Sequence, residues 1–378
     1  MVVSPVSDSL RIKSLFRNYD VHFIGDFTLP LQGLVDQHAF FVIDAIVWDI
    51  YREKLKGVIS EGRLLLVEAN ERNKTIGKCQ EIIEILVGRN FRRNDRLVAI
   101  GGGVIQDITA FTASILYRGV DWTFFPTTLL AQADSCIGGK TSINLGDKKN
   151  LVGNFYPPTA IYINTAFLAT LPEVDILSGI GEMLHYYYYA ASPLFEKIVT
   201  ERPQLLADRR LLLDYIRESL QIKKGVIEID EFDKGERNKF NYGHTFGHAL
   251  ESLTDYAVKH GQAVAIGMDI ANHISLRRGI MSVDEFDRVH TLLVKNFPAY
   301  EWDHFDMESY IQFLSKDKKN ISQDLVCILA ERPGHITRQH ISMDETFRDI
   351  LREYFNDVLP AQAHPGQSLE YQTSGRML

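Results

Sequence analysis

The chain has 378 residues, which is enough for two domains, and its 45% hydrophobic and 24% charged residues are typical of a soluble globular protein. Its net charge of −8 argues against a nucleic-acid partner. The three cysteines are widely spaced, which argues against a disulfide framework and for a reduced compartment. Without a signal peptide or an apolar run of membrane-spanning length, the sequence predicts a cytoplasmic protein that has no membrane partner.

Short apolar runs alternate with helical patterns in the first part of the chain. Such an alternation of strands and helices favours a parallel sheet that is covered on both faces. The predicted strands are residues 40–44, 64–68, 97–100, 122–125 and 160–163, and helical spacing predicts helices at 46–56 and 76–87.

Long helical patterns dominate after about residue 170. They cover residues 182–189, 205–229, 245–256 and 263–278. We therefore predict an α/β domain over residues 1–170 and a mostly helical domain over 171–359. Residues 360–378 are rich in Gln, Ser, Gly and Pro, and we expect them to be a disordered tail.

Three consecutive glycines, Gly101 to Gly103, join a predicted strand to a predicted helix. Glycines let the backbone approach a pyrophosphate, and a helix N-terminus favours an anion. The pattern is not GxGxxG, so a tight βα turn explains it equally well. Asp44, at the end of an earlier strand, is placed either to accept ribose hydroxyls or to cap a helix.

A second loop collects lysines, glycines and amides between residues 134 and 150. Lys140 and Asn150 offer a charged donor and an amide donor that suit a phosphate. The alternative is a solvated basic loop. Surrounding apolar residues favour a buried loop over that alternative.

Histidines cluster in the second half of the chain. His244 and His248 are four residues apart, so they share one face of a helix, and His260 follows twelve residues later. Three imidazoles that converge with one carboxylate would suit a catalytic zinc with an open position. The pair lacks the glutamate of HExxH, so buried, hydrogen-bonded histidines and an unrelated third remain an alternative.

Taken together and in order, these motifs resemble the 3-dehydroquinate synthase family of sugar-phosphate cyclases, over roughly residues 40 to 330. The resemblance implies a Rossmann-like NAD-binding domain followed by a helical domain for metal and substrate. The matching residues are Gly101-Gly102-Gly103 with Asp107, Tyr117-Arg118-Gly119, Pro126 to Gln132, Asp134, Gly138 to Thr141, Lys149-Asn150, Thr170-Leu171-Pro172, Gly181-Glu182, Asn241 to His248, and His260-Gly261.

The resemblance also implies roles for individual residues. A zinc ion, with Co²⁺ as the alternative, would be bound by Glu182, His244 and His260. NAD would be approached by Asp44, Glu71, Lys74, Gly102, Gly103, Val104, Asp107, Thr127, Thr128 and Lys149. The substrate phosphate would be held by Lys140, Asn150, His248 and a lysine of the segment Asp317-Lys318-Lys319, for which we take Lys318. Asp134 would bind substrate hydroxyls, and Lys223, Arg237 and Asn241 the rest of the substrate, including its carboxylate. Arg118 would reach the neighbouring subunit's site, which implies a homodimer.

One residue departs from the family pattern. Relatives carry a lysine three residues after the zinc glutamate, and here the position is His185, within Glu182-Met183-Leu184-His185-Tyr186. Histidine is shorter than lysine and largely neutral at pH 7. We expect His185 to affect the choice of substrate more than the chemistry, or else to donate a hydrogen bond and change only rates.

The reaction that the resemblance implies runs in one pocket: transient oxidation by NAD, elimination of phosphate, reduction, ring opening and an intramolecular aldol step. The first-choice substrate is 3-deoxy-D-arabino-heptulosonate 7-phosphate of the shikimate route, because Lys223 and Arg237 suit a carboxylate. Alternatives are an amino analogue of that substrate, or sedoheptulose 7-phosphate in cyclitol biosynthesis. A metal-dependent alcohol dehydrogenase and a non-catalytic relative are further alternatives, which the lysine-rich loop and the retained zinc ligands disfavour.

Overall fold

The computed structural model describes residues 8–35, 38–146, 148–300, 302, 305–315 and 324–359. The chain forms two compact units, a first unit Met1–Asn238 and a second unit Lys239–Leu378. The predicted tail at 360–378 and the predicted phosphate ligand Lys318 lie outside the described residues. Within those residues, no helix combines the length and apolar content that a membrane span requires.

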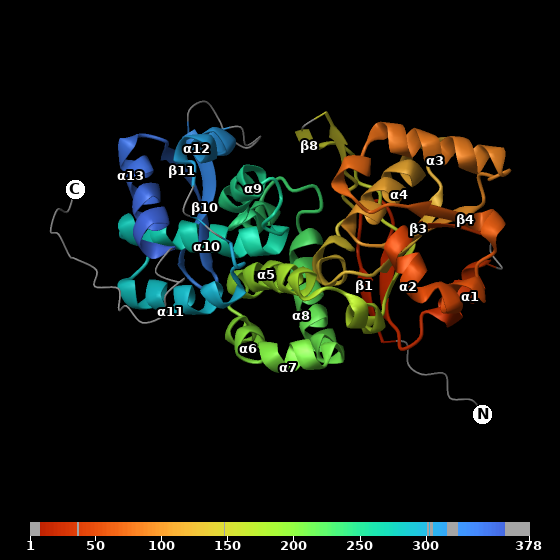
Figure 1. The fold of residues 1–378 in the computed structure, drawn as a ribbon, viewed down its shortest axis with the longest axis horizontal. Coiled ribbons are helices and arrows are strands. Elements are labelled where there is room, and N and C mark those ends of the chain that lie inside the picture. The colour runs from red at the N-terminus through yellow and green to blue at the C-terminus, as the bar shows by residue number, and fades with distance from the viewer. Residues whose placement is uncertain are drawn as a thin grey trace. The chain divides into compact units, whose positions relative to one another are not determined.

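A seven-stranded sheet in the order β1-β2-β9-β6-β5-β3-β4 forms the centre of the first unit (Figure 1). Every strand pair from β2 to β4 is parallel, as the alternation of strands and helices predicts, whereas β1 adds an antiparallel edge that no sequence pattern predicted. The strands are β1 (Ser9–Ile12), β2 (Tyr19–Phe23), β3 (Ala39–Asp44), β4 (Leu64–Val67), β5 (Arg96–Gly101), β6 (Asp121–Pro126) and β9 (Ala160–Ile163). A separate hairpin, β7 (Ile143–Leu145) and β8 (Lys148–Val152), lies in the loop predicted to bind phosphate.

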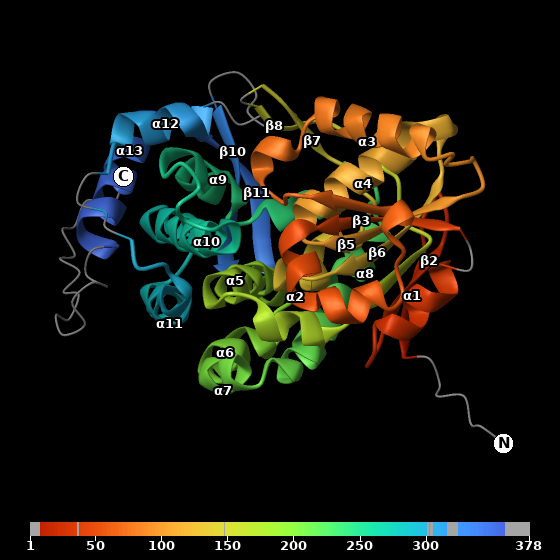
Figure 2. The same ribbon diagram turned by 45° about the vertical axis from the view of Figure 1, so that its right-hand side comes forward.

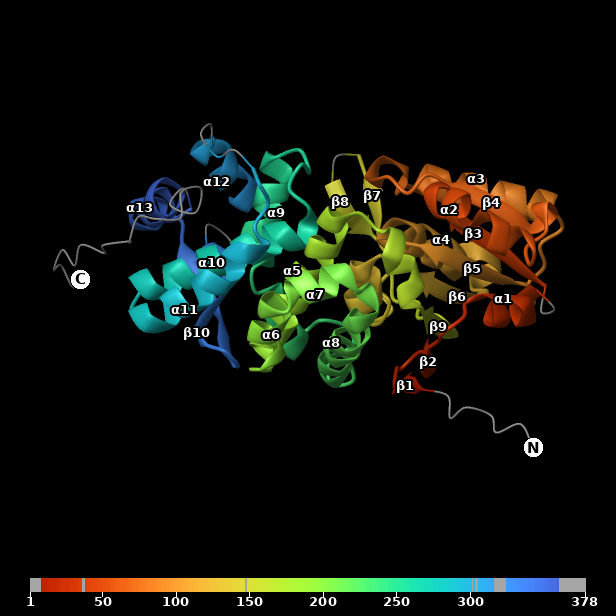
Figure 3. The same ribbon diagram turned by 60° about the horizontal axis from the view of Figure 1, so that its bottom comes forward.

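Helices cover both faces of this sheet (Figure 2), because its strands are apolar on both sides. Phe41 and Ile43 of β3 pack with Val98 and Ile100 of β5 against Trp48 on one face. That face carries α1 (Thr28–Val35) and α2 (Ala45–Lys56), and the other carries α3 (Ile76–Gly88) and α4 (Gly103–Ile115). The remaining helices of the unit are α5 (Glu173–Tyr189), α6 (Leu194–Thr200), α7 (Arg202–Ala207) and α8 (Leu212–Ile227) (Figure 3).

Helices α5 and α8 belong to the first unit, although the predicted division of domains fell after residue 170. They pack on the short segment η4 (Ala131–Ser135): Ser219 Oγ donates to the Ala133 carbonyl at 2.9 Å, and Lys223 Nζ donates to the Asp134 carbonyl at 2.8 Å. These bonds explain why the compact unit extends to Asn238. The division after residue 170 stays a prediction.

The prediction of one continuous helix over residues 205–229 is wrong. The chain breaks at Asp208, whose backbone is extended (φ −131°, ψ 92°) and whose side chain accepts a hydrogen bond from the Arg210 amide. The result is α7, a short turn η6 (Arg209–Leu211) and α8. An aspartate that bonds to the amide two residues on competes with the helix for that donor.

The second unit is mostly helical and is built around α10 (His260–Arg277), which is buried on nearly all sides. This arrangement, after the α/β first unit, confirms the predicted fold class. The unit also contains an antiparallel hairpin that the helical prediction missed, β10 (Asp324–Arg332) with β11 (His335–Ser342). Its other helices are α9 (His244–Leu253), α11 (Val283–Leu293), α12 (Met307–Ser315) and α13 (Glu345–Glu353).

Glycines let the backbones of α9 and α10 touch. A Cβ on Gly247 would lie 2.8 Å from the Ala263 carbonyl oxygen, and one on Gly267 would overlap the Gly243 carbonyl oxygen. Real Cβ atoms do not approach other atoms this closely, so no larger residue fits at Gly247 or Gly267 without moving a helix. The close approach brings the first turns of the two helices together, and these turns carry the predicted histidines.

Candidate functional site

The glycine turn lies between β5 and α4, at the carboxyl edge of the parallel sheet. A Cβ on Gly101 would lie 2.6 Å from the Ile105 side chain, and one on Gly102 would lie 2.9 Å from the Thr128 side chain, so packing explains these two glycines. At Gly103 a Cβ would meet nothing within 4 Å. The space in front of Gly103 therefore stays open at the N-terminus of α4, where a bound anion is favoured.

Polar residues predicted for the cofactor gather beside this turn. The buried Lys74 Nζ lies 2.9 Å from Asp107 Oδ2 and 3.6 Å from Glu71 Oε1. Burial raises the pKa of Asp107 to about 6, although the Lys74 ammonium opposes the rise. Asn144 of β7 donates to Glu71 Oε1 at 2.9 Å, so the β7–β8 hairpin is tied to this cluster.

Other predicted cofactor residues lie near the same edge of the sheet. The Thr127 amide donates to the Gly101 carbonyl at 2.9 Å, and Val104 is half-buried in the first turn of α4. Asp44 ends β3 and caps α2, because its Oδ1 accepts a hydrogen bond from the Ile46 amide at 3.0 Å. Burial raises the pKa of Asp44 above its ordinary value. Asp44 therefore has the helix-capping role that the sequence had offered as one of two alternatives.

The β8 strand carries the predicted Lys149 and Asn150. Asn150 has a left-handed backbone (φ 53°), and its amide donates to Asn144 Oδ1 at 2.9 Å. Arg118, predicted to reach a neighbouring subunit, is exposed and also left-handed (φ 68°).

Asp134 is the centre of a buried cluster in the first unit. Its Oδ1 accepts a hydrogen bond from Lys223 Nζ at 2.7 Å and another from the Tyr186 hydroxyl. Lys223, predicted to hold the substrate, thus contacts the carboxylate predicted to bind substrate hydroxyls. Tyr186 ends the segment Glu182 to Tyr186 that departs from the family pattern at His185, but Tyr186 received no role from the sequence.

Two further predicted cations belong to the same unit. Arg237 is buried, its Nη1 donates to the Glu231 carbonyl at 2.5 Å, and a Cβ on Gly138 would lie 2.5 Å from its Nη2. Lys140 Nζ lies 2.5 Å from Asp233 Oδ2. Burial and then the Arg237 charge lower the pKa of Lys140 from its ordinary value, against the pull of Asp233.

His185, at the position where the resemblance predicts a lysine, is fully buried in α5. Its Nδ1 lies 2.8 Å from the Glu182 carbonyl oxygen and 3.3 Å from Glu182 Oε1. One ring nitrogen is therefore turned back toward the predicted metal ligand on the preceding helical turn. A lysine at this position would extend further and would carry a fixed charge.

The three predicted histidines of the second unit converge. Each offers one ring nitrogen within 4.8 Å of the others, and the ring centroids are 5.4 to 5.5 Å apart. His260 Nδ1 lies 3.0 Å from Glu251 Oε2, and His244 Nδ1 lies 3.2 Å from the Tyr242 carbonyl oxygen. A histidine whose Nδ1 is held in this way presents Nε2 to a metal, so the cluster fits a divalent ion. Asn241, predicted to bind substrate, ends the turn η7 (Glu236–Asn241) just before α9.

Sequence reasoning missed several residues of these clusters. Glu251 could have been found, because it follows His244 by seven residues and His248 by three, on the same helical face. Asn144 lies in the lysine-rich loop without a predicted partner, and Asp233 lies between the predicted helix 205–229 and Arg237, in a stretch without a prediction. No local pattern connects either residue to the group that it contacts.

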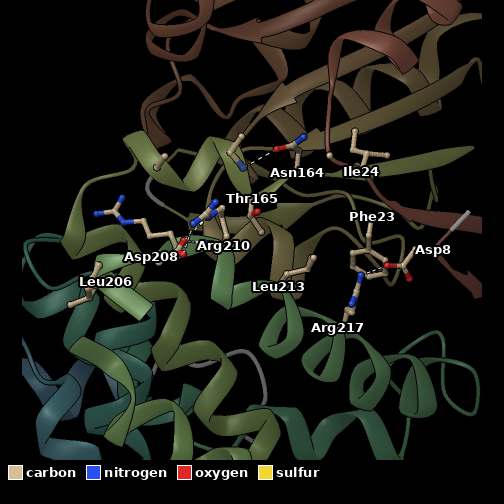
Figure 4. A pocket seen from close by; sticks show the side chains of 15 residues that line it. Asp8, Phe23, Ile24, Asn164, Thr165, Leu206, Asp208, Arg210, Leu213 and Arg217 are labelled. Atoms are coloured by element: carbon tan, nitrogen blue, oxygen red, sulfur yellow. Dashed lines mark hydrogen bonds and ion pairs between the residues drawn. The ribbon is translucent and has the colours of Figure 1, made fainter. Parts of the chain in front are cut away.

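A cavity of about 830 Å³ lies elsewhere in the first unit, at the ends of β2 and β9 (Figure 4). Among the described residues, none of those predicted for the site lines it. Its three arginines already have partners: Arg210 pairs with Asp208, Arg217 pairs with Asp8, and Arg209 donates to two backbone carbonyls. The cavity is therefore separate from the clusters above.

Comparison with known proteins gives the same family over most of the chain. The model of the 3-dehydroquinate synthase N-terminal region matches residues 64–178, and that of the C-terminal region matches residues 179–320. The 3-dehydroquinate synthase of Helicobacter pylori (strain ATCC 700392 / 26695) is 35% identical over 343 residues, which cover 89% of this chain and 97% of that protein.

Solved structures share the fold at lower identity. A 2-epi-5-epi-valiolone synthase from Streptomyces hygroscopicus subsp. jinggangensis 5008, with NAD⁺ and Zn²⁺ bound, has a TM-score of 0.79 at 24% identity, covering 94% of this chain and 99% of that one. A 2-deoxy-scyllo-inosose synthase, complexed with carbaglucose-6-phosphate, NAD⁺ and Co²⁺, has a TM-score of 0.77 at 21% identity, covering 92% and 99%. The two family models, matched end to end from residue 64 to residue 320, identify this chain as a member of the 3-dehydroquinate synthase family.

Proposed function

We propose that the protein is a sugar-phosphate cyclase that converts 3-deoxy-D-arabino-heptulosonate 7-phosphate to 3-dehydroquinate, with loss of phosphate, in the shikimate route. Family membership supports a cyclase over a plain alcohol dehydrogenase. The choice of this substrate is supported by one observation, the set of cationic side chains in the first unit. Burial and then the charges of Arg237 and Lys223 lower the pKa of Lys140, and a substrate with both a phosphate and a carboxylate makes use of such a set of cations.

The residues present fit the two cofactors. His244 and His260 would hold a divalent metal, with Glu182 as the further ligand that the family resemblance assigns, and the open backbone at Gly103 would receive a phosphate of the dinucleotide at the N-terminus of α4. When bound, these cofactors supply transient acceptance of a hydride and polarisation of a substrate oxygen. Solved neighbours with NAD⁺ and either Zn²⁺ or Co²⁺ support this assignment.

The side chains of this protein then bind and orient the substrate. Lys140 would hold the phosphate as a point charge, Arg237 would pair with the carboxylate, and Asp134 would accept a hydrogen bond from a ring hydroxyl. The departing phosphate can itself take up the proton, so no strong protein base is required. The work of the protein is thus orientation and electrostatic stabilisation.

His185 keeps two other substrates as alternatives. Its buried contact with Glu182 leaves the pocket without the fixed ammonium of the family lysine. A single change of this kind in a pocket can alter discrimination strongly. Sedoheptulose 7-phosphate and an amino analogue of the heptulosonate are therefore the second candidates. We also propose a homodimer in which Arg118 approaches the neighbouring site.

The test is release of phosphate by purified protein with NAD and Zn²⁺, offered heptulosonate phosphate and sedoheptulose 7-phosphate in parallel. We expect turnover of the first, and loss of it in the H260A variant. Turnover of the second alone would replace the substrate in this proposal and make His185 a specificity residue. Accumulation of NADH from a plain alcohol, without phosphate release, would overturn the cyclase assignment, because a cyclase returns the hydride.

A further inference from the structure

The two oxygens of the Asp134 carboxylate have different surroundings. Oδ1 accepts hydrogen bonds from both the Lys223 ammonium and the Tyr186 hydroxyl. Oδ2 accepts no hydrogen bond from the residues that the structure describes, and the side chain is 17% exposed. One edge of the carboxylate is therefore fixed by the protein, and the other has no protein donor within the described part of the chain.

The backbone that carries Asp134 is held on several sides. Segment η4 has π-helical geometry, which is often found at functional sites. Ser219 Oγ binds the Ala133 carbonyl, and Gln132 Nε2 donates to the carbonyls of Pro126 and Asn164, each at 3.0 Å. Because the backbone is fixed, rotation of the side chain is the freedom that remains to the carboxylate.

Tyr186 limits that rotation from a different helix. It lies on α5, whereas Lys223 lies on α8, so the two donors reach Oδ1 from separate elements. Tyr186 is buried, and burial followed by the charge of Asp134 raises its pKa well above 10, which keeps the phenol a neutral donor. Lys223 alone would leave the carboxylate free to turn about its contact with a single flexible side chain.

We propose that Tyr186 is a positioning residue, which holds Oδ1 of Asp134 so that Oδ2 faces the substrate hydroxyl. This inference rests on the proposed function, in which Asp134 binds that hydroxyl. Segment 182–186 was singled out in the sequence for Glu182 and His185, and Tyr186 gives it a third role. Catalysis is sensitive to such placement, because small displacements of a reacting group cost large factors in rate.

The variant Y186F removes the hydroxyl and keeps the ring. We expect kcat/KM for the ketose phosphate to fall about 10- to 100-fold, which is the range for loss of a hydrogen bond to a charged group. The loss should lie mainly in kcat, because Lys140 and Arg237 are untouched. The matched control is Y187F on the same helix, which removes a buried hydroxyl that donates to the Tyr215 carbonyl at 2.7 Å. Its kcat/KM should stay within about twofold of the wild-type value.

A double-mutant cycle separates positioning from a merely structural role. In a D134N background, Y186F should have little further effect on kcat/KM, because there is no longer a carboxylate to orient. Equal losses in both backgrounds would overturn the proposal, and so would unchanged turnover in Y186F.

A crystal structure of Y186F gives a readout that needs no turnover. We expect the Asp134 carboxylate to rotate or to occupy two orientations. An unchanged orientation would overturn the proposal whatever the substrate proves to be. Absence of phosphate release by the wild-type protein would instead contradict the proposed function, so the two failures are distinguishable.

Discussion

At the scale of single residues, His273 in α10 is fully buried, and among the described residues neither ring nitrogen has a hydrogen-bond partner. Glu353 Oε1 lies 3.8 Å from its Nε2, which is beyond hydrogen-bond distance. Burial lowers the pKa of His273 to about 4, although the nearby Asp269 carboxylate opposes the change. The imidazole is thus neutral in the folded protein at physiological pH.

This pKa gives a prediction with a definite sign. Between pH 6.5 and about 4 the unfolded chain binds a proton at His273 that the folded protein does not bind, so folding stability is lost as the pH falls through this window. The loss would reach about 3 kcal/mol at most. Titration of the histidine ring protons by NMR, assigned with H273Q, should show one resonance that titrates near pH 4. H335Q, at an exposed position, serves as the control, and a midpoint near 6.5 for His273 would contradict the prediction.

At the scale of elements, the close contact of α9 with α10 places His244 and His248 beside His260. At Gly267 an added Cβ would overlap the carbonyl oxygen of Gly243, the residue that precedes α9. The variant G267A should therefore push the helices apart, lower the unfolding midpoint and weaken binding of Co²⁺ by at least about tenfold. Competition with a chelating dye, together with thermal unfolding, measures both effects.

The control for this prediction is G225A on the exposed face of α8, where an added Cβ meets nothing within 4 Å. An alanine there should leave stability unchanged or raise it by about 0.5–1 kcal/mol, as expected for a helix interior. If G267A binds Co²⁺ as tightly as G225A does, the glycine contact does not position the histidines.

Elements with a strong local pattern could be predicted from the sequence, and those decided by distant contacts could not. The central strands are buried on both faces, so continuous apolar runs such as 40–44 and 97–100 revealed them. Spacing likewise put His244 and His248 on one face. The break at Asp208 depends on one side chain competing for an amide, and β10 lies within a half of the chain where helical patterns dominate.

The same distinction holds within the candidate site. Asp134, Tyr186 and Lys223 come from three elements. Nothing in their sequence positions indicates that Tyr186 and Lys223 both donate hydrogen bonds to Oδ1 of Asp134. The family resemblance supplied a role for two of them only. Their contact arises from the packing of α5 and α8 on η4, which is a property of the folded chain.

At the scale of the whole molecule, the proposed homodimer makes each site depend on two subunits. Arg118 lies in a run of three left-handed residues with Tyr117 (φ 51°) and Gly119 (φ 116°), which presents its side chain at the surface. Left-handed backbone at non-glycine residues is strained and often accompanies function. We therefore expect R118A and K140A each to be nearly inactive alone.

Mixing these two variants tests the shared site. If subunits exchange at random, half of the dimers are mixed, and each mixed dimer holds one site without either substitution, so activity should return to about a quarter of the wild-type value. Sedimentation or light scattering establishes that dimers are present. No recovery on mixing, with dimers shown to exchange, would mean that Arg118 serves its own subunit.

The ion pair between Lys140 and Asp233 has a consequence for selectivity among anions. If Lys140 binds the substrate phosphate, the phosphate does not enter an empty positive site but replaces a carboxylate that already neutralises the lysine. The affinity for the substrate phosphate then reflects the exchange of the Asp233 carboxylate for the phosphate at Lys140. Partly exposed pairs of this kind contribute only about 0.2–1 kcal/mol, so a dianion can displace Asp233 at little cost. A monoanion such as chloride gains nothing by the same exchange, and the internal carboxylate thus sets a threshold of charge that an incoming ligand must exceed.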